Sequence, residues 1–345
     1  MIDFYVGGYA RPEQAGIKRF HLDPETLEYR QVAEFSGLAN PSWLLKHPEK
    51  PVLYAVEELT PEGRVLALAI RPDGGLERLG ESLPSGGADP CHLSLSPDGR
   101  WLFAANYTSG SLSVFALGAD GAIAGRSDFR QHAIEAPGAI PTRQERAHVH
   151  FTLCDGGRVF VCDLGSNTVF VYGWDNERGR LVDTDARLPF PPASGPRHLA
   201  LSADGKRLYV LCELTSAVHV FGQDACGAWQ PVQAVPAIPD FDAFETFNWS
   251  VGAAIHFADA RTLYVSNRGH QSLVRFDVGA DGRLSGRRTI PSGGKTPRDF
   301  LPVGGLLLAA NQDSDALAVL RADGDGAPVA RIPAIKPTCV CLIGA

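Results

Sequence analysis

The stretch DPCHLSLSPDGRWLFAANY (89–107) contains two apolar runs joined by a Ser-Pro-Asp-Gly-Arg turn. Asp-Gly between two β-rich runs is a strong hairpin signal, so the stretch predicts two adjacent antiparallel strands. The run SLSVFAL (111–117) follows and alternates apolar with polar residues, as a half-exposed strand does. With one more polar strand after the next turn, the sequence predicts a unit of four short strands.

The second run of this unit recurs seven times along the chain at intervals of roughly 50 residues, which is typical of propeller blades. The copies are FYVGGY (4–9), LYAVEE (53–58), LFAANY (102–107), VFVCDL (159–164), LYVLCE (208–213), LYVSNR (263–268) and LLAANQ (307–312). The repeat predicts an all-β protein, a single seven-bladed β-propeller domain spanning 1–345 with four-stranded antiparallel blades. A pair of β-sandwiches is the alternative, and seven copies argue against it.

The two ends of the chain complement each other. The segment PTCVCLI (337–343) has the pattern of an inner strand with no second strand after it, and FYVGGY (4–9) has no inner strand before it. We therefore expect the C-terminal strand to join the N-terminal blade and close the ring, which removes two exposed strand edges. Two longer segments, 131–145 and 237–249, are expected to form loops over one face.

Charge and composition narrow the classes of function. The 345 residues include 39 acidic and 32 basic side chains, a net charge of -7, so we expect no nucleic-acid binding through a general basic field. No apolar run reaches the roughly 18 residues of a membrane span, and we expect no membrane partner. Residues 1–9 lack a basic leader region, which favours a cytoplasmic location. Seven cysteines without a CxxC motif are expected to be free and mostly buried thiols.

Polar residues gather where the repeat predicts one mouth of the channel. Inner strands line a propeller's channel, and ligands bind at its mouth. The starts of the inner strands align as Ser42, Cys91, His148, Arg197, Ala253 and Arg298, followed by Trp43, His92, Val149, His198, Ala254 and Asp299. The ends of the second strands supply Tyr9, Glu58, Tyr107, Leu164, Glu213, Arg268 and Gln312. A packing repeat does not need such divergence, so it indicates a site to which each blade contributes a different group.

These residue types support acid–base chemistry on an anionic ligand. Arginines bind carboxylate or phosphate with paired hydrogen bonds, and we assign this role to Arg197, Arg268 and Arg298. Glu213 or His148 is the candidate general base on a water, with an arginine stabilising the resulting oxyanion. No G-x-S-x-G, HExxH or P-loop motif is present. His148 and His150 could bind a metal with one acid, but no third ligand is evident, so no metal is predicted.

The chain resembles the seven-bladed propeller lactonase family, which includes the cycloisomerase-type 6-phosphogluconolactonases and the fungal carboxymuconate-lactonizing enzymes. The similarity runs from Tyr5 to near Cys341. Its segments are NPSWL (40–44), DPCHLSLSPDGRWLFAANY (89–107), GPRHLALSADGKRLYV (195–210), SNRGHQSL (266–273), GGKTPRDF (293–300) and ANQDSD (310–315). The resemblance implies a hydrolase that opens a sugar-acid lactone, a small anionic substrate, without an obligatory metal or cofactor.

The resemblance also implies roles for individual residues. Its His-x-His segment matches His148 and His150, and its Arg-His pair matches Arg197 and His198. The catalytic residues are then expected to be His148, Glu213, Arg197 and Arg268, with Arg298 as the alternative arginine. The expected substrate-binding residues are His92, His150, His198, Arg298, Asn106 and Gln312. One departure is Ala254, where the family usually has an acid.

The resemblance leaves more than one function open. Hydrolysis of 6-phosphogluconolactone to 6-phosphogluconate is the first expectation. An aldaro-lactonase acting on galactaro- or glucaro-1,5-lactone is the second, and a carboxymuconate cycloisomerase is the third. A non-catalytic binding propeller is the competing class, because the repeat alone would suffice for it.

Overall fold

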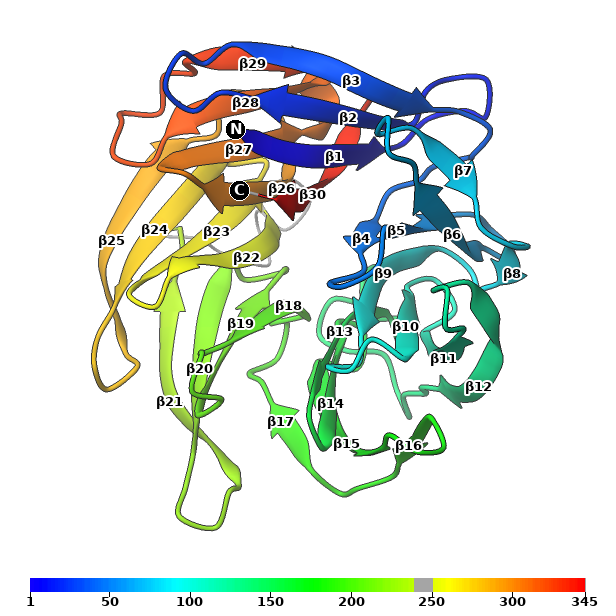
Figure 1. Ribbon diagram of the computed structural model, residues 1–345. Coiled ribbons are helices and arrows are strands. Elements are labelled where there is room, and N and C mark those ends of the chain that lie inside the picture. The colour runs from blue at the N-terminus through cyan, green and yellow to red at the C-terminus, as the bar shows by residue number, and fades with distance from the viewer. Residues whose placement is uncertain (239–250, 345) are drawn as a thin grey trace.

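Seven antiparallel sheets form a ring in the computed structural model, which describes residues 1–238 and 251–344 (Figure 1). The innermost strands contact one another around the ring in the order β30, β4, β9, β13, β18, β22, β26 and back to β30. A three-residue 3-10 turn, η1 (Gln312–Ser314), is the one helical element in the described part of the chain. The predicted all-β, seven-bladed propeller is therefore confirmed.

The strands are grouped by blade as follows. The first blade has β30 (Pro337–Gly344), β1 (Ile2–Gly8), β2 (Ile17–Leu22) and β3 (Tyr29–Phe35). The second has β4 (Leu44–Lys46), β5 (Val52–Glu57), β6 (Arg64–Ile70), β7 (Leu76–Arg78) and β8 (Leu83–Pro84). The third has β9 (Pro90–Leu95), β10 (Trp101–Asn106), β11 (Ser111–Leu117) and β12 (Ile123–Gln131). The fourth has β13 (Val149–Asp155), β14 (Arg158–Asp163), β15 (Thr168–Asp175), β16 (Arg180–Val182) and β17 (Arg187–Pro189).

The remaining three blades each have four strands. The fifth has β18 (Pro196–Leu201), β19 (Arg207–Cys212), β20 (Ala217–Gln223) and β21 (Trp229–Pro236). The sixth has β22 (Val251–Asp259), β23 (Thr262–Arg268), β24 (Ser272–Val278) and β25 (Leu284–Pro291). The seventh has β26 (Pro297–Val303), β27 (Leu306–Asn311), β28 (Ala316–Arg321) and β29 (Ala330–Pro333).

The ring closes as the complementary ends predict. Strand β30 pairs antiparallel with β1, with Val6 opposite Val340 and Phe4 opposite Leu342. The outer strands β2 and β3 then continue this blade away from the channel (Figure 1). The last strand of the chain thus becomes the innermost strand of the first blade, and neither β1 nor β30 is left as an open edge at the closure.

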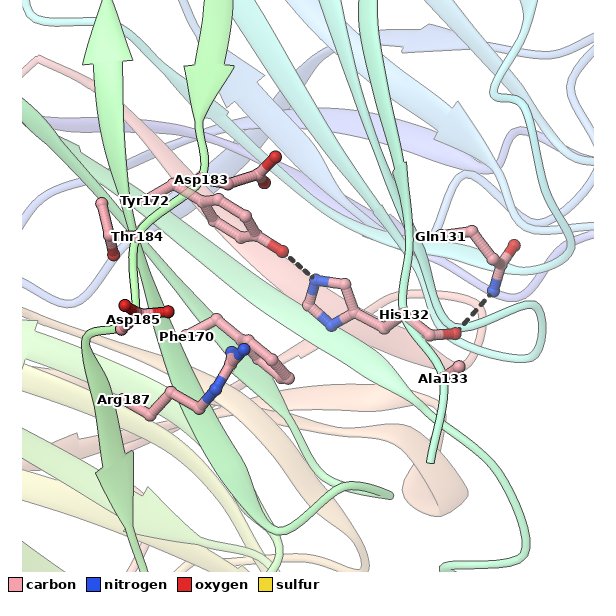
Figure 2. Close-up of a pocket in the computed structure, with 9 residues that line it drawn as sticks. All are labelled: Gln131, His132, Ala133, Phe170, Tyr172, Asp183, Thr184, Asp185 and Arg187. Carbon is pink, nitrogen blue, oxygen red and sulfur yellow. Dashed lines mark hydrogen bonds between the residues drawn. The ribbon is translucent and has the colours of Figure 1, made fainter. Parts of the chain in front are cut away.

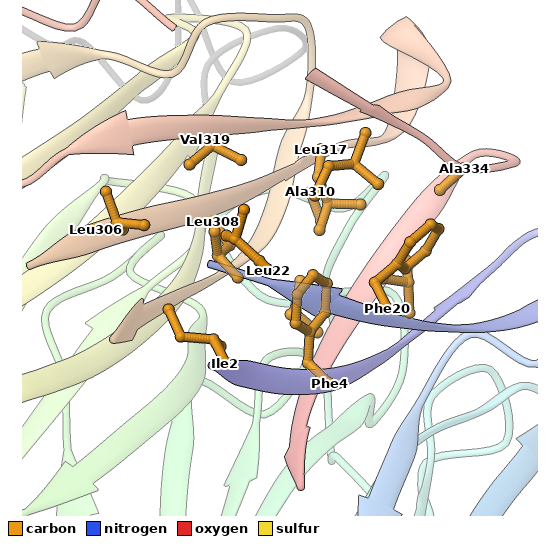
Figure 3. Packing of buried hydrophobic residues seen from close by; sticks show 13 residues of the cluster. Ile2, Phe4, Phe20, Leu22, Leu306, Leu308, Ala310, Leu317, Val319 and Ala334 are labelled. Atoms are coloured by element: carbon orange, nitrogen blue, oxygen red, sulfur yellow. The ribbon is translucent and has the colours of Figure 1, made fainter. Parts of the chain in front are cut away.

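Hydrophobic clusters between neighbouring blades hold the ring together. Figure 3 shows the cluster between the first and the seventh blade, in which Phe4 and Phe20 face Leu308 and Val319. The alternation of strand residues places one apolar face of each blade against the next. Closure of the ring therefore buries apolar surface from both ends of the chain at once.

The substitution Leu308→Ala is expected to destabilise this closure. Leu308 is fully buried, and removing such a leucine typically costs about 2–5 kcal/mol in the free energy of unfolding. Val329 in the same blade is 38% exposed, so Val329→Ala should change that free energy by less than about 0.5 kcal/mol. Urea unfolding of both variants measures the difference, and equal stabilities would contradict the packing described.

The structure describes one of the two segments expected to form loops. The segment 132–148 lies between β12 and β13 and contains no strand or helix, as expected of a loop. The other predicted loop, 237–249, falls mostly on residues outside the described ones.

All seven cysteines are free thiols, and Cys91, Cys162, Cys212, Cys339 and Cys341 are buried, which confirms the expectation of mostly buried thiols. No helix in the described residues is long and apolar enough to cross a membrane.

Candidate active site

Bulges at the start of the inner strands set which side chains enter the channel mouth. In β9 the pairing passes from Pro90 to His92 and leaves Cys91 unpaired. The same one-residue shift leaves out His150 in β13, Arg197 in β18, Arg298 in β26 and Thr338 in β30. A bulge turns the extra residue away from the regular alternation of the strand. Five blades therefore present one re-aimed side chain each at the same level.

These re-aimed side chains line two adjoining cavities on the axis of the ring. The outer cavity has a volume of about 240 Å³ and is lined by Glu58, Asp89, Cys91, Tyr107, Thr108, Arg143, His150, Glu213, Arg268 and Arg298. A narrower inner cavity shares Glu58, Cys91, His150 and Arg298 with it and adds Ser42, Trp43, Arg197, His198 and Thr338. Between them, all seven blades contribute to this mouth.

Glu213 is the centre of an arginine cluster in this mouth. Its Oε2 accepts a hydrogen bond from Arg197 Nε at 2.8 Å and lies 2.8 Å from Arg268 Nη2, and its Oε1 accepts from Arg143 Nη2. Burial alone would raise the pKa of Glu213, but Arg268, Arg143 and Arg197 hold it well below its usual value. Glu213 is therefore an ionised anchor for three guanidinium groups and a weak base.

One of these arginines, Arg268, keeps unused hydrogen-bonding capacity. Arg268 forms an ion pair with Glu213, but the angle at its Nη2 does not meet hydrogen-bond geometry. The Nε and Nη2 of Arg268 therefore donate to none of the described residues. Buried donors without a partner are uncommon in proteins and often mark a functional site. Burial lowers the pKa of Arg268, while Glu213 acts in the opposite direction. The mouth therefore has more positive charge and more donors than its own residues use.

Arg298, which lines both cavities, is a further arginine with free donors. Its guanidinium carbon lies 5.2 Å from the centre of the Tyr9 ring, and within the described chain it makes no hydrogen bond. Although burial acts to lower it, the pKa of Arg298 is raised by the neighbouring Tyr9 and Glu58. The nearby carboxylate of Glu58 is occupied, because Tyr9 Oη donates to it at 2.8 Å and Ser42 Oγ donates to its other oxygen. Arg298 is thus available to bind an anion.

His150 is the titratable group that lines both cavities without a strong partner. Its Nδ1 lies 3.8 Å from Cys91 Sγ, and its Nε2 makes no hydrogen bond with the residues that the structure describes. Burial, reinforced by the charge of Arg197, lowers its pKa well below the usual value for histidine, so the ring is neutral near pH 7. A neutral imidazole with a free nitrogen beside arginines can accept a proton from a bound water.

His148, the histidine expected to be the base, has a different environment. Its ring stacks on Tyr107 at 4.4 Å, its Nδ1 lies 3.0 Å from the Tyr107 carbonyl, and its Nε2 lies 3.1 Å from Glu145 Oε1. It lines neither cavity, because it precedes the bulge and His150 occupies the re-aimed position. The residue of β13 that is structurally equivalent to Arg197 is therefore His150, two residues after the His148 that the repeat alignment selects.

The remaining expected site residues divide between the mouth and the core. His198 lines the inner cavity, where its Nε2 lies 3.0 Å from Arg197 Nη1. Three others line neither cavity: His92 packs on Phe151, Asn106 donates to Ser85 O and Ser111 Oγ, and Gln312 donates to Asp313. The departure at Ala254 lies in a hydrophobic cluster rather than at the mouth.

The mouth also contains residues that were not assigned roles from the sequence. Glu58 and Tyr107 had been aligned at the ends of second strands, and their position there was the available signal. Asp89, Thr108 and Arg143 come from turns and from the segment 132–148. Arg143 has no counterpart in the repeat, so nothing in the repeat pattern could identify it.

A larger cavity of about 360 Å³ lies away from this mouth and has a structural explanation (Figure 2). The outermost strand of the fourth blade is interrupted between β16 and β17, which uncovers Tyr172. Tyr172 Oη lies 2.9 Å from His132 Nε2, and His132 Nδ1 lies 2.9 Å from Asp163 Oδ2. Asp163 Oδ1 accepts from the backbone N–H of His148 at 2.7 Å, so this network fixes the start of β13, which carries His150.

The sequence and the fold both match known proteins. Residues 3–342 match the family described as lactonase, 7-bladed β-propeller. A 6-phosphogluconolactonase of Bacillus subtilis (strain 168) is 30% identical over 97% of both chains, and one of Formosa agariphila is 29% identical over 95% of both. The structure of a periplasmic gluconolactonase of Pseudomonas aeruginosa covers 99% of both chains with a TM-score of 0.88 and 31% identity. The chain belongs to the seven-bladed β-propeller lactonase family and, like the relatives named above, is a hydrolase acting on a lactone ester.

Proposed function

We propose that the chain hydrolyses an anionic sugar-acid lactone in the mouth cavity, with 6-phosphogluconolactone as the first candidate substrate. The observation that carries this proposal is the free, neutral imidazole of His150 in one cavity with arginines whose donors are not all used. The names of the relatives from B. subtilis and F. agariphila support the choice of substrate. No step needs a cofactor, and the whole of 1–345 would act as one domain.

The proposed reaction is attack of water on the lactone carbonyl. His150 Nε2 takes a proton from the water as its oxygen bonds to the carbonyl carbon, and the carbonyl oxygen becomes an oxyanion. Arg268 and Arg197 stabilise that negative charge in a site largely closed to solvent. When the bond between the carbonyl carbon and the ring oxygen breaks, the imidazolium returns the proton to the ring oxygen, which becomes a hydroxyl group. The products are the free acid and a neutral His150.

Glu213 has a positioning role in this proposal rather than that of the base. Both of its oxygens are bound by arginines, Oε1 by Arg143 and Oε2 by Arg197 and Arg268, so neither is free to accept a proton from water. Removal of the carboxylate would leave three arginines close together without a counter-charge. Arg298, which lines both cavities and makes no hydrogen bond within the described chain, would donate to oxygen atoms of the substrate.

Two other functions share this geometry and are arms of the same test. An aldaro-lactone presents a carboxylate in place of a phosphate, and arginines bind both groups. The similar P. aeruginosa protein is described as a gluconolactonase, so a neutral lactone belongs in the test as well.

The cytoplasmic location expected from the sequence stays a prediction, because that P. aeruginosa protein is described as periplasmic.

Initial rates on a panel of lactones test the proposed substrate. Proton release is followed at pH 6.5 to 7 with 6-phosphoglucono-1,5-lactone, glucono-1,5-lactone, galactaro- and glucaro-1,5-lactone and carboxymuconolactone, each against a control without enzyme. We expect the phosphorylated lactone to have the highest kcat/KM, at least about tenfold above the neutral one, because a charged hydrogen bond contributes about 1.5–3 kcal/mol. A higher kcat/KM on an aldaro-lactone would make that lactone the proposed substrate in place of 6-phosphogluconolactone. A higher kcat/KM on the neutral lactone would contradict the proposal of an anionic substrate.

A further inference from the structure

We propose that Arg143 is a specificity residue that binds the negatively charged group of the substrate remote from the lactone carbonyl. The inference rests on the proposed lactonase function and deepens it. It assigns the discrimination between charged and neutral lactones to one side chain of the segment 132–148, outside the repeated part of the blades.

The first argument is the depth of the arginines in the mouth. The exposed fraction of the side chain rises from 2% for Arg197 through 14% for Arg268 to 28% for Arg143. Arg197 lines the inner cavity and Arg143 the outer one. A lactone whose carbonyl lies beside His150 and the deeper arginines therefore extends its far end towards Arg143.

The second argument is the set of hydrogen-bond donors that Arg143 leaves free. Its Nη2 donates to Glu213 Oε1 and, at 3.3 Å, to Tyr107 Oη. Its Nε and Nη1 donate to none of the described residues, although the side chain lines the cavity. These two nitrogens lie on different edges of the guanidinium, so each can donate a separate charge-assisted hydrogen bond to an anion in the cavity. The charge of Glu213 is shared with Arg197 and Arg268, so positive charge is left for a ligand.

The third argument is that the segment presenting Arg143 is held in place. The adjacent Gln144 is fully buried, and its Nε2 donates to the Leu164 carbonyl at 3.0 Å. Ile140 packs in a cluster with Leu164 and Leu214. Arg143 is thus positioned before the ligand arrives, which reduces the entropy lost on binding.

Kinetics of Arg143→Gln on a matched pair of lactones test the inference. For the anionic lactone of the panel with the highest kcat/KM, we expect a fall of about 10–100-fold, mainly through KM, because a charge-assisted hydrogen bond is lost. For the neutral glucono-1,5-lactone the change should be below about threefold, within the spread of small context effects. Arg143→Lys, which keeps the charge but not the positions of the guanidinium donors, should give an intermediate loss.

The control is Arg146→Gln, a neighbouring arginine whose side chain is 62% exposed and does not line the cavity. It should leave the ratio of the two kcat/KM values unchanged. Equal losses on both lactones for Arg143→Gln, or an unchanged ratio, would overturn the inference, since Arg143 would then act only through Glu213.

A binding measurement separates failure of this inference from failure of the proposed function. Calorimetric titration with 6-phosphogluconate and with neutral gluconamide needs no turnover. If wild type opens no lactone, the proposed function fails. A selective loss of 6-phosphogluconate affinity in Arg143→Gln would still support an anion contact, and an unchanged affinity would overturn it.

Discussion

The substitution His150→Gln is expected to lower kcat/KM by about 10²–10⁴-fold, the usual contribution of general acid–base catalysis. Glutamine fills a similar volume and cannot take the proton, so the thermal unfolding temperature should change little. Because burial and Arg197 lower the pKa of His150, wild type should keep full kcat/KM from pH 7 to below pH 6.5. The rate should fall only where His150 becomes protonated.

His148→Gln is the matched control for this prediction. His148 lies two residues away, lines neither cavity and contacts Tyr107 and Glu145 instead. Its replacement should reduce kcat/KM by less than about tenfold, the range of a positional disturbance and not that of a lost base. A larger loss for His148→Gln than for His150→Gln would show that the two roles are reversed.

Folding stability is expected to fall steeply as the pH drops below 6.5. Burial, with the charge of Arg197, lowers the pKa of His92, His150 and His198 well below the value in an unfolded chain. Below pH 6.5 the unfolded chain therefore binds protons that the folded chain does not, and stability is fully present only above that pH. Each such histidine contributes a slope of about 1.4 kcal/mol per pH unit, or about 4 kcal/mol per pH unit for the three.

Urea unfolding at pH 7, 6 and 5 measures this slope. His219, with a pKa lowered to about 4 by burial, acts in the same direction. The carboxylate of Glu213 is held ionised and contributes only at lower pH. His92→Gln should reduce the slope by about a third, because one of the three buried rings is removed. A stability that is constant from pH 7 to 5 would mean that these histidines are protonated or absent from the buried channel.

The repeat explains why the architecture could be predicted from the sequence. Tight Asp-Gly turns and alternating runs are local features, and their sevenfold recurrence determines a ring of blades. The closure by β30 follows from the same reasoning, since each end of the chain lacks what the other supplies. The repeat also points to the arginine positions, because Arg197 and Arg298 share the column of inner-strand starts and Arg268 ends a second strand.

The details of the site depend on features that the repeat does not encode. His148 and His150 are equally good matches to a column of inner-strand starts, and only the bulge in β13 selects His150. His92 and Asn106 lie one residue from mouth positions; His92 packs on Phe151 and His198 of two other inner strands, and Asn106 turns into its own blade. Arg143 comes from an unrepeated segment, and its approach to Glu213 is a tertiary contact over 70 positions of sequence.

The rate of lactone opening by wild-type protein tests the central claim most directly. It is measured by proton release at pH 6.5, where spontaneous hydrolysis is slow, with increasing concentrations of each anionic lactone. The account predicts saturation and an acceleration of about 10⁶-fold or more over the uncatalysed reaction for at least one of them, as enzymes typically achieve. Rates equal to the control without enzyme for every lactone would contradict it and would favour a propeller that binds a ligand without turning it over.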